Sequence, residues 1–288
     1  MKITIVTGSR ADWGLLEWPI KALQEDAHFQ GQILKIWGAT HDQAFRACTD
    51  SFTAERPDLM LCLGDRYEIL AAATAAHLLR VPIAHIGGGD VTEGSYDDAM
   101  RDAISRFAHV HFVTSTSAMA RLSGMGLRNI HLVGNPGIDF IRHAEWKKER
   151  PIAEPYVVVS YQAETLDGAD SWSGIIHPLV EEHIDKKVVF IRPNPDRGSD
   201  LINTYISNWA ALAGDRVTVH DFLPHDEFLN LIFHCEEFIG NSSSMLYEAP
   251  ELGIKTRMIG KRQKGRTIPW GDGFASDRIV KILKYASL

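Results

Sequence analysis

Short apolar runs rich in β-branched residues alternate along the chain with longer amphipathic segments, and this alternation restricts the fold more than any other feature of the sequence. Strands without a polar face are typical of a parallel sheet covered on both faces by the helices that connect them. The fold class expected is therefore α/β. In the first half, the pattern predicts strands at Lys2–Thr7, Gln32–Trp37, Leu59–Leu63, Pro82–Ile86, Val110–Thr114 and Ile130–Val133, and helices at Leu15–Glu25, His41–Ala54, Tyr67–Leu79, Asp97–Ala108 and Ser117–Met125.

A second series of strands and helices follows a charged, proline-ended stretch at Lys147–Pro151, which reads as a linker. Its expected strands are Tyr156–Tyr161, Lys187–Ile191, Arg216–His220, Glu237–Gly240 and Thr256–Ile259, and its expected helices include His225–Cys235, Ser244–Leu252 and Ser276–Tyr285. We expect two Rossmann-like domains, residues 1–150 and 151–288, in an arrangement with a central cleft. Ligands of such folds bind beyond the carboxyl ends of the strands, so the loops that follow strands are the places to search.

Composition excludes several classes of protein. Of the 288 residues, 45% are hydrophobic and 23% charged, which is ordinary for a folded domain and disfavours disorder. No apolar run reaches about 18 residues, so no membrane-spanning helix is expected. A net charge of −7 disfavours nucleic acid as a partner. Three scattered cysteines favour a reducing cytoplasm over a disulfide framework or a zinc site.

Two loops of the first half carry charged residues directly after a strand. Gly8–Gly14 contains Arg10, which could donate to an anion or simply lie on the surface of a turn. Its spacing does not match the dinucleotide fingerprint. Leu63–Glu68 contains Asp65, which could cap the following helix or act as a catalytic carboxylate.

A glycine triplet at Gly87–Gly89 follows another expected strand. It is surrounded by His85 and by four carboxylates, namely Asp90, Glu93, Asp97 and Asp98. Crowded carboxylates raise one another's pKa, which suits acid–base work near neutral pH. The alternative is an acidic surface loop, but a glycine triplet directly after a buried strand favours a functional role.

Three loops of the second half are suited to phosphate. The first loop contains Asn241, Ser242, Ser243 and Ser244 at the expected start of a helix, and its hydroxyl and backbone N–H groups could bind an anion. The alternative is that these serines only cap the helix. Glu248, farther along that helix, could accept bonds from a ribose diol. Further cations and amides that could reach a diphosphate, or lie solvated, are Arg192, Asn194, Arg262 and Arg266.

Together these loops resemble the UDP-N-acetylglucosamine 2-epimerase family, and within it the hydrolysing branch. The resemblance covers most of the chain and rests on GSRADWGLL, the stretch from GDRYEIL to DDAMRDAIS, VGNPGID, RPNPDRGS, NSSSMLYEAPELG and IGKRQKGR. It implies a GT-B-like pair of Rossmann domains with a UDP-sugar as partner, no cofactor and no metal. It implies that the serine loop, Glu248, Arg262 and Arg266 bind UDP, while Arg10, Asp65 and Asp90 face phosphate and sugar.

The resemblance also implies a reaction. A base removes the proton at C2 of the sugar while UDP leaves C1, water then adds to the glycal, and N-acetylmannosamine and UDP are released. The carboxylates available are Asp65 and Asp90 first, then Glu93, Asp97 and Asp98, with Arg101 in the DDxxR motif beside them.

The sequence departs from the family pattern at three positions. Gln162 stands where the family has histidine, Asp102 replaces a histidine after Arg101, and Asp90 replaces a glutamate. Two alternatives therefore stay open: a glycosyltransferase that uses a UDP-sugar donor, with a small molecule, glycan or nucleic-acid base as acceptor, and a catalytically silent UDP-sugar binding protein. A homo-oligomer also stays open.

Overall fold

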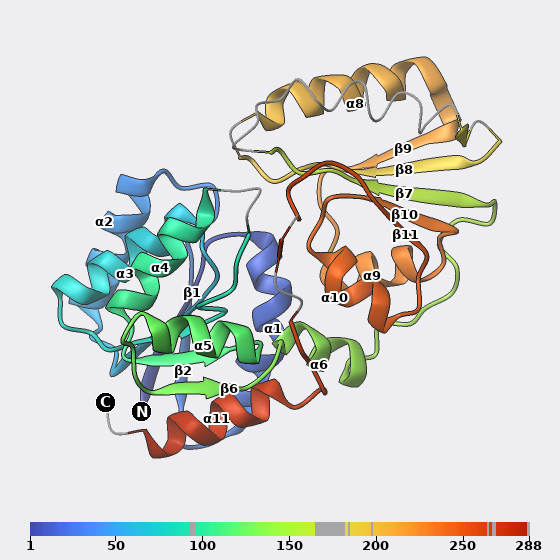
Figure 1. The fold of residues 1–288 in the computed structure, drawn as a ribbon. Coiled ribbons are helices and arrows are strands. Elements are labelled where there is room, and N and C mark those ends of the chain that lie inside the picture. Colours follow the sequence, from blue (N-terminus) through green and yellow to red (C-terminus); the bar gives the residue numbers. More distant parts are fainter. Residues whose placement is uncertain are drawn as a thin grey trace. The chain divides into compact units, whose positions relative to one another are not determined.

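The structure is a computed structural model that describes residues 1–92, 96–164, 182–183, 185–196, 198–263, 265–266 and 269–286. The chain divides into two compact units. Unit 1 comprises the described residues of Met1–Val91, Asp97–His143 and Thr267–Leu288, and unit 2 those of Thr92–Tyr96 and Ala144–Arg266. Each unit is an α/β layer structure of its own (Figure 1).

Unit 1 is built on a six-stranded parallel sheet with the order β2-β1-β3-β4-β5-β6. Its strands are β1 (Lys2–Thr7), β2 (Gln30–Lys35), β3 (Leu59–Leu63), β4 (Ile83–Ile86), β5 (Val110–Val113) and β6 (Ile130–Leu132). Its helices are α1 (Arg10–Glu25), α2 (His41–Ala54), α3 (Tyr67–Leu78), α4 (Asp97–Phe107), α5 (Thr116–Gly124), α6 (Pro136–His143) and α11 (Ala275–Tyr285).

Side chains of successive strand residues fill two cores on opposite faces of the unit 1 sheet. Ile3 and Ile5 of β1 join the core beneath α1 and α11, whereas Val6 joins the core beneath α2, α3 and α4. Because both faces are covered, every residue of β3 and β4 is buried, and so is every residue of β1 except Lys2. This double covering is the reason that the strands read as unbroken apolar runs in the sequence.

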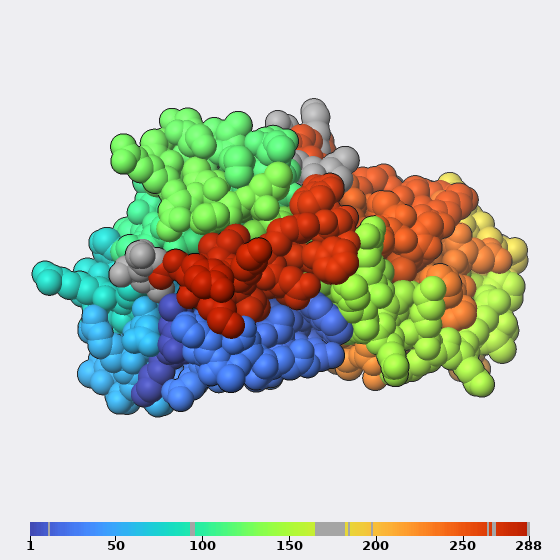
Figure 2. Space-filling view, turned by 90° about the horizontal axis from the view of Figure 1, so that it is seen from below, coloured from blue at the N-terminus to red at the C-terminus, as the bar shows by residue number. Residues whose placement is uncertain are grey.

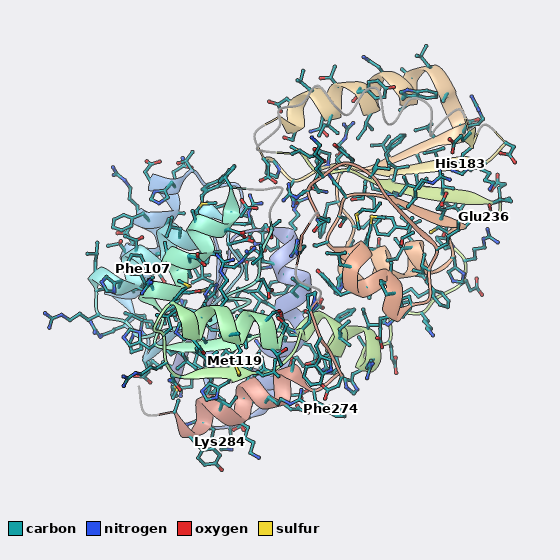
Figure 3. The ribbon with its side chains drawn as sticks, viewed as in Figure 1. Phe107, Met119, His183, Glu236, Phe274 and Lys284 are labelled. Carbon is teal, nitrogen blue, oxygen red and sulfur yellow. The ribbon has the colours of Figure 1, made fainter. Side chains whose placement is uncertain are left out.

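Helix α11 packs in unit 1 although more than a hundred residues of unit 2 precede it. It lies against α1, where Ile279 and Leu283 enter the core (Figure 2). Asp139 of α6 accepts hydrogen bonds from the backbone N–H groups of Ala275 and Ser276 at 3.1 and 2.6 Å, and so caps the start of α11. At the other end, Lys284 (labelled in Figure 3) pairs with Asp26 at 3.0 Å.

Unit 2 has a five-stranded parallel sheet with the order β11-β10-β7-β8-β9. The strands are β7 (Tyr156–Ser160), β8 (Lys187–Ile191), β9 (Val217–His220), β10 (Glu237–Gly240) and β11 (Thr256–Met258). Helix α8 (Ser199–Ala213), followed by a 3₁₀ turn at Gly214–Arg216, covers one face, and α9 (His225–Phe233) and α10 (Ser244–Glu251) lie on the other (Figure 1).

The predicted α/β class with two Rossmann-like sheets is confirmed. Four strands, β1, β3, β8 and β10, have the predicted bounds. The other strands start or end one or two residues from their predicted bounds. The linker, the unit boundaries and the start of α1 differ as well. The expected linker Lys147–Pro151 packs within unit 2, where the Lys148 N–H donates to Asn230. The chain enters unit 2 at Ala144, and the last segment, expected in the domain 151–288, belongs with unit 1. Helix α1 starts at Arg10 because Ser9 accepts from the Asp12 N–H.

No helix among the described residues is long and apolar enough to cross a membrane.

Candidate functional site

Each sheet has a topological switch point, where the chain leaves neighbouring strands in opposite directions. In unit 1 it lies between β1 and β3, and in unit 2 between β7 and β10. Ligands of open α/β sheets bind at the carboxyl ends of such strands. The described site residues that were predicted lie in loops that follow strands of the two sheets, or in the helices that these loops open. We call Asp65, Asp90, Asp98 and Arg101 the unit 1 cluster, and Gln162, Asn241, Ser242–Ser244 and Glu248 the unit 2 cluster.

Arg101 organises the unit 1 cluster from α4. Its side chain is 2% exposed, and it donates to the carboxylates of Asp65 and Asp98 and, at 2.6 Å, to the backbone carbonyl of Asp90. Burial acts against the charged guanidinium, but the three aspartates outweigh it and raise the pKa of Arg101. One buried cation therefore fixes three acidic residues, the farthest of which lies 36 positions from it in the sequence.

Asp90 is buried and held by contacts from two directions. Its Oδ1 accepts from the hydroxyl of Thr114 at 2.9 Å, while its carbonyl accepts from Arg101. The preceding Gly89 has a φ of +80°, and a Cβ there would lie 2.5 Å from the backbone oxygen of Ala118. Part of the glycine triplet therefore serves close packing against α5, which in turn fixes where Asp90 stands.

His85 positions the β3 loop. Its Nε2 lies 2.8 Å from the carbonyl of Gly64, so this nitrogen carries the proton and donates, while Nδ1 lies 3.0 Å from Ser105 Oγ and accepts. Burial lowers the pKa of His85 to about 4. The imidazole is therefore neutral near pH 7, and it holds the backbone beside Asp65 rather than exchanging protons.

The other residues predicted for unit 1 are placed as follows. Arg10 is exposed at the start of α1, and Asp97 begins α4. Glu93 lies outside the described residues. Asp102, which replaces a family histidine, forms an ion pair with Arg121 at 2.7 Å.

Asp12 is a further carboxylate at this switch point that sequence reasoning did not single out. It lies in the first turn of α1 and is 8% exposed. Burial raises the pKa of Asp12 to about 7. The sequence signal was its position within GSRADWG, but only the fold shows that this turn faces the β3 loop.

In unit 2, Asn241 and Gln162 join the loops that follow β10 and β7. The Asn241 Oδ1 accepts from the Gln162 N–H at 2.6 Å, and its Nδ2 donates to the Gln162 carbonyl at 2.9 Å. The Gln162 side chain in turn accepts from the Asn194 N–H at 2.9 Å. Gln162 thus braces three loops, and the Asn241 amide is engaged within the protein.

The serine loop opens helix α10. Ser243 is the N-cap residue, and the Ser242 hydroxyl accepts from the Ser244 N–H at 3.3 Å and donates to the Ser244 hydroxyl at 3.2 Å. All three serines are half-buried. The positive end of the α10 dipole and the serine hydroxyls beside it form a place where an anion is stabilised.

Glu248 lies one turn farther along α10, and its side chain is buried. Its Oε1 lies 2.6 Å from Nε2 of His225, the first residue of α9. Neither α9 nor α10 alone would fix the carboxylate, so this contact sets its direction. His225 is a site residue that the sequence pattern did not reveal.

The predicted basic residues of unit 2 have different surroundings. Arg192 donates to Asp221, to the Asn203 carbonyl and to Ser207, so its guanidinium anchors α8. Arg262 donates to the Ala163 carbonyl at 2.7 Å, and Arg266 donates to Gln263 at 3.1 Å. Buried Glu164 accepts from the backbone of Lys261 and Arg262, which holds this loop near the switch point.

Known proteins resemble this chain in sequence and in fold. One relative is the Campylobacter jejuni protein named GDP/UDP-N,N'-diacetylbacillosamine 2-epimerase (hydrolyzing). It is 27% identical to this chain, in an alignment that covers 92% of this chain and 82% of that protein. A Neisseria meningitidis UDP-N-acetylglucosamine 2-epimerase is 28% identical, in an alignment that covers 92% of this chain and 81% of that protein. The structure of the Methanocaldococcus jannaschii UDP-GlcNAc 2-epimerase in complex with UDP-GlcNAc and UDP has a similar fold, with a TM-score of 0.81 at 18% identity, over 99% of this chain and 100% of that one.

The profile described as UDP-N-acetylglucosamine 2-epimerase matches residues 26–270. That range includes the strands of both sheets except β1, as well as both clusters. The chain belongs to the UDP-N-acetylglucosamine 2-epimerase family.

Proposed function

We propose that the protein is a hydrolysing 2-epimerase of UDP-2-acetamido sugars, with UDP-N-acetylglucosamine as the first substrate to test. The observation that carries the proposal is the set of acidic residues that Arg101 holds at the unit 1 switch point. Relatives named as hydrolysing 2-epimerases support the reaction type. The same two relatives make UDP-N,N'-diacetylbacillosamine the second substrate to test.

The reaction needs a base and a stabilised leaving group. A carboxylate takes the proton from C2, the electron pair of that C–H bond forms the C1–C2 double bond, and the C1–O bond to UDP breaks. Water then adds its hydroxyl to C1 and a proton to the opposite face of C2, which gives N-acetylmannosamine. We assign the proton transfers to Asp65 and Asp90, with Asp97, Asp98 and Glu93 as further candidates.

We assign UDP to unit 2. The α10 N-terminus with Ser242, Ser243 and Ser244 suits the diphosphate, because the positive end of the helix dipole favours an anion there. Glu248, held by His225, suits the ribose diol. Arg262 and Arg266 lie in the loop that Glu164 supports. Arg10 stays a candidate phosphate ligand from unit 1, and Asn194, Asn241 and Arg192 serve by holding their loops.

The two residues that replace family histidines have internal partners, since Gln162 braces loops and Asp102 pairs with Arg121. Proton transfer therefore rests on the carboxylates of unit 1. The three free thiols favour a cytoplasmic location. Whether the protein forms a homo-oligomer is tested by gel filtration.

Proton NMR of the protein with UDP-N-acetylglucosamine in heavy water tests the proposal. Free N-acetylmannosamine carrying deuterium at C2, released with UDP and without an acceptor, is the expected product. Saturable binding without turnover of either sugar nucleotide would instead support the transferase or the silent binding protein. Asp65→Asn and Asp90→Asn should lower turnover by orders of magnitude, whereas Ser243→Ala and Arg266→Ala should mainly weaken UDP binding.

A further inference from the structure

A buried carboxyl with an oxygen that has no partner lies at the switch point of unit 1. Asp12 Oδ2 is buried and has no hydrogen-bond partner among the residues that the structure describes. An unpartnered buried polar atom costs about 1–3 kcal/mol, so native structures rarely keep one without a role. The helix cap does not need this side chain, because Ser9 serves as the cap of α1.

The carboxyl stands between the ends of β1 and β3. A Cβ at Gly8 would lie 3.3 Å from Asp12 Oδ2, and a Cβ at Gly64 would lie 4.0 Å from Oδ1. Glycine at both positions places no side chain between this carboxyl and the two loops. Asp65 directly follows Gly64, so Asp12 faces the loop that carries the leading catalytic candidate.

Charges of both signs lie around Asp12. Arg66 favours its ionised form, but Glu68 holds the Arg66 guanidinium through two hydrogen bonds of 3.0 and 3.1 Å. Asp65 and Glu68 favour the protonated form, and Ser9 and the buried thiol of Cys62 complete the ionisable or polar neighbours. With desolvation the largest effect, the pKa of Asp12 rises to about 7, so both forms are populated near neutral pH.

We infer that Asp12 is the proton-holding residue of the unit 1 site, which takes over the proton that a cluster carboxylate removes from the sugar. The inference rests on the proposed function. In the step, the cluster carboxylate releases the former C2 proton, an O–H bond forms on the Asp12 carboxylate, and the cluster carboxylate is ionised again. Arg101 favours this direction because it stabilises the ionised form of Asp65. Protonated Asp12 later returns its proton to the site or to water.

The first test is the pH dependence of kcat/KM for Asp12→Asn, Asp12→Glu and the wild type. The wild type should lose activity below about pH 7 as Asp12 becomes protonated. Asp12→Asn should lower kcat about 100-fold with little change in KM and should lack this acidic limb, and Asp12→Glu should restore part of both. Asp42→Asn, which changes the exposed first-turn aspartate of α2, should behave as the wild type.

The thermal midpoint separates a functional role from a structural one. Asp12→Asn removes a buried charge, so at pH 8 its Tm should exceed that of the wild type. A lower Tm together with lost activity would identify Asp12 as a structural residue, and an unchanged kcat or an unchanged acidic limb would also overturn the inference.

Carbon-13 NMR of labelled aspartate carboxyls makes the test independent of turnover. One resonance should titrate near pH 7 in the wild type and be missing from Asp12→Asn. If neither sugar nucleotide is turned over but this resonance is present, the proposed function is wrong, whereas the inference that Asp12 holds a proton near pH 7 is retained. If no such resonance exists, the inference has failed whatever the activity.

Discussion

Nε2 of His225 and Oε1 of Glu248 lie 2.6 Å apart, and both side chains are buried in unit 2. The two residues come from the first turn of α9 and the second turn of α10, so the contact fixes the carboxylate relative to the serine loop. If Glu248 binds the ribose, His225 governs nucleotide affinity without contacting the nucleotide.

His225→Ala should weaken UDP binding about tenfold, because the Glu248 carboxylate loses the donor that directs it and is left buried. Isothermal titration calorimetry with UDP measures the change, and KM should rise while kcat changes little. His234→Ala, which removes a half-buried histidine bonded to the Lys148 carbonyl, is the control and should keep wild-type affinity. Equal affinities for all three proteins would show that His225 does not position the site.

Arg101→Ala should destabilise unit 1 by about 3 kcal/mol, since it leaves acidic groups without their buried cation. Urea unfolding measures this loss, and turnover should fall at the same time because Asp65 and Asp98 lose their common partner. Arg121→Ala breaks the more exposed pair with Asp102 and should cost less than about 1 kcal/mol. A stable, active Arg101→Ala variant would contradict the role given to this residue.

Gly89→Ala should destabilise the protein by about 2–3 kcal/mol and reduce activity, because the added Cβ meets the Ala118 carbonyl and the φ of +80° is strained for alanine. Gly38→Ala is the matched control. Gly38 has a φ of +70° but open space around its Cβ position, so that variant carries only the strain of about 1 kcal/mol. Comparing urea midpoints separates the clash from the strain, and equal losses would show that the packing against α5 does not matter.

The Asp12 carboxyl predicts how stability depends on pH. Its pKa is raised from 3.8 in the unfolded chain to about 7 in the folded protein, so the folded state binds the proton more tightly. This contribution to stability is fully present below about pH 4 and is lost as pH rises through about 7. The difference in unfolding free energy between wild type and Asp12→Asn should therefore shift by up to roughly 4 kcal/mol in favour of the variant between pH 4 and 8. Urea titrations across this range measure it, and a constant difference would contradict the raised pKa.

Strand positions could be predicted from the sequence because burial on both faces leaves a local mark, as in the apolar run Leu59–Leu63. The Ser242–Ser244 loop was also visible, since a helix start has local chemistry. Contacts between residues far apart in the sequence could not be predicted. Nothing near Asp12 shows that it faces Gly64, and nothing near His225 points to Glu248. The predicted ligand Arg192 proved to be an anchor for α8 for the same reason, because its partners Asn203, Ser207 and Asp221 come from elements that the pattern does not place.

The return of α11 to unit 1 has a consequence for synthesis on the ribosome. Ile279 and Leu283 complete the core that Ile3 and Leu16 begin, so β1 lacks part of this core until α11 has been translated. The described core around β7 and β8 consists of residues that precede α11, so this core can form before α11 is translated. One apolar face of the unit 1 sheet therefore stays incompletely covered until α11 emerges from the ribosome.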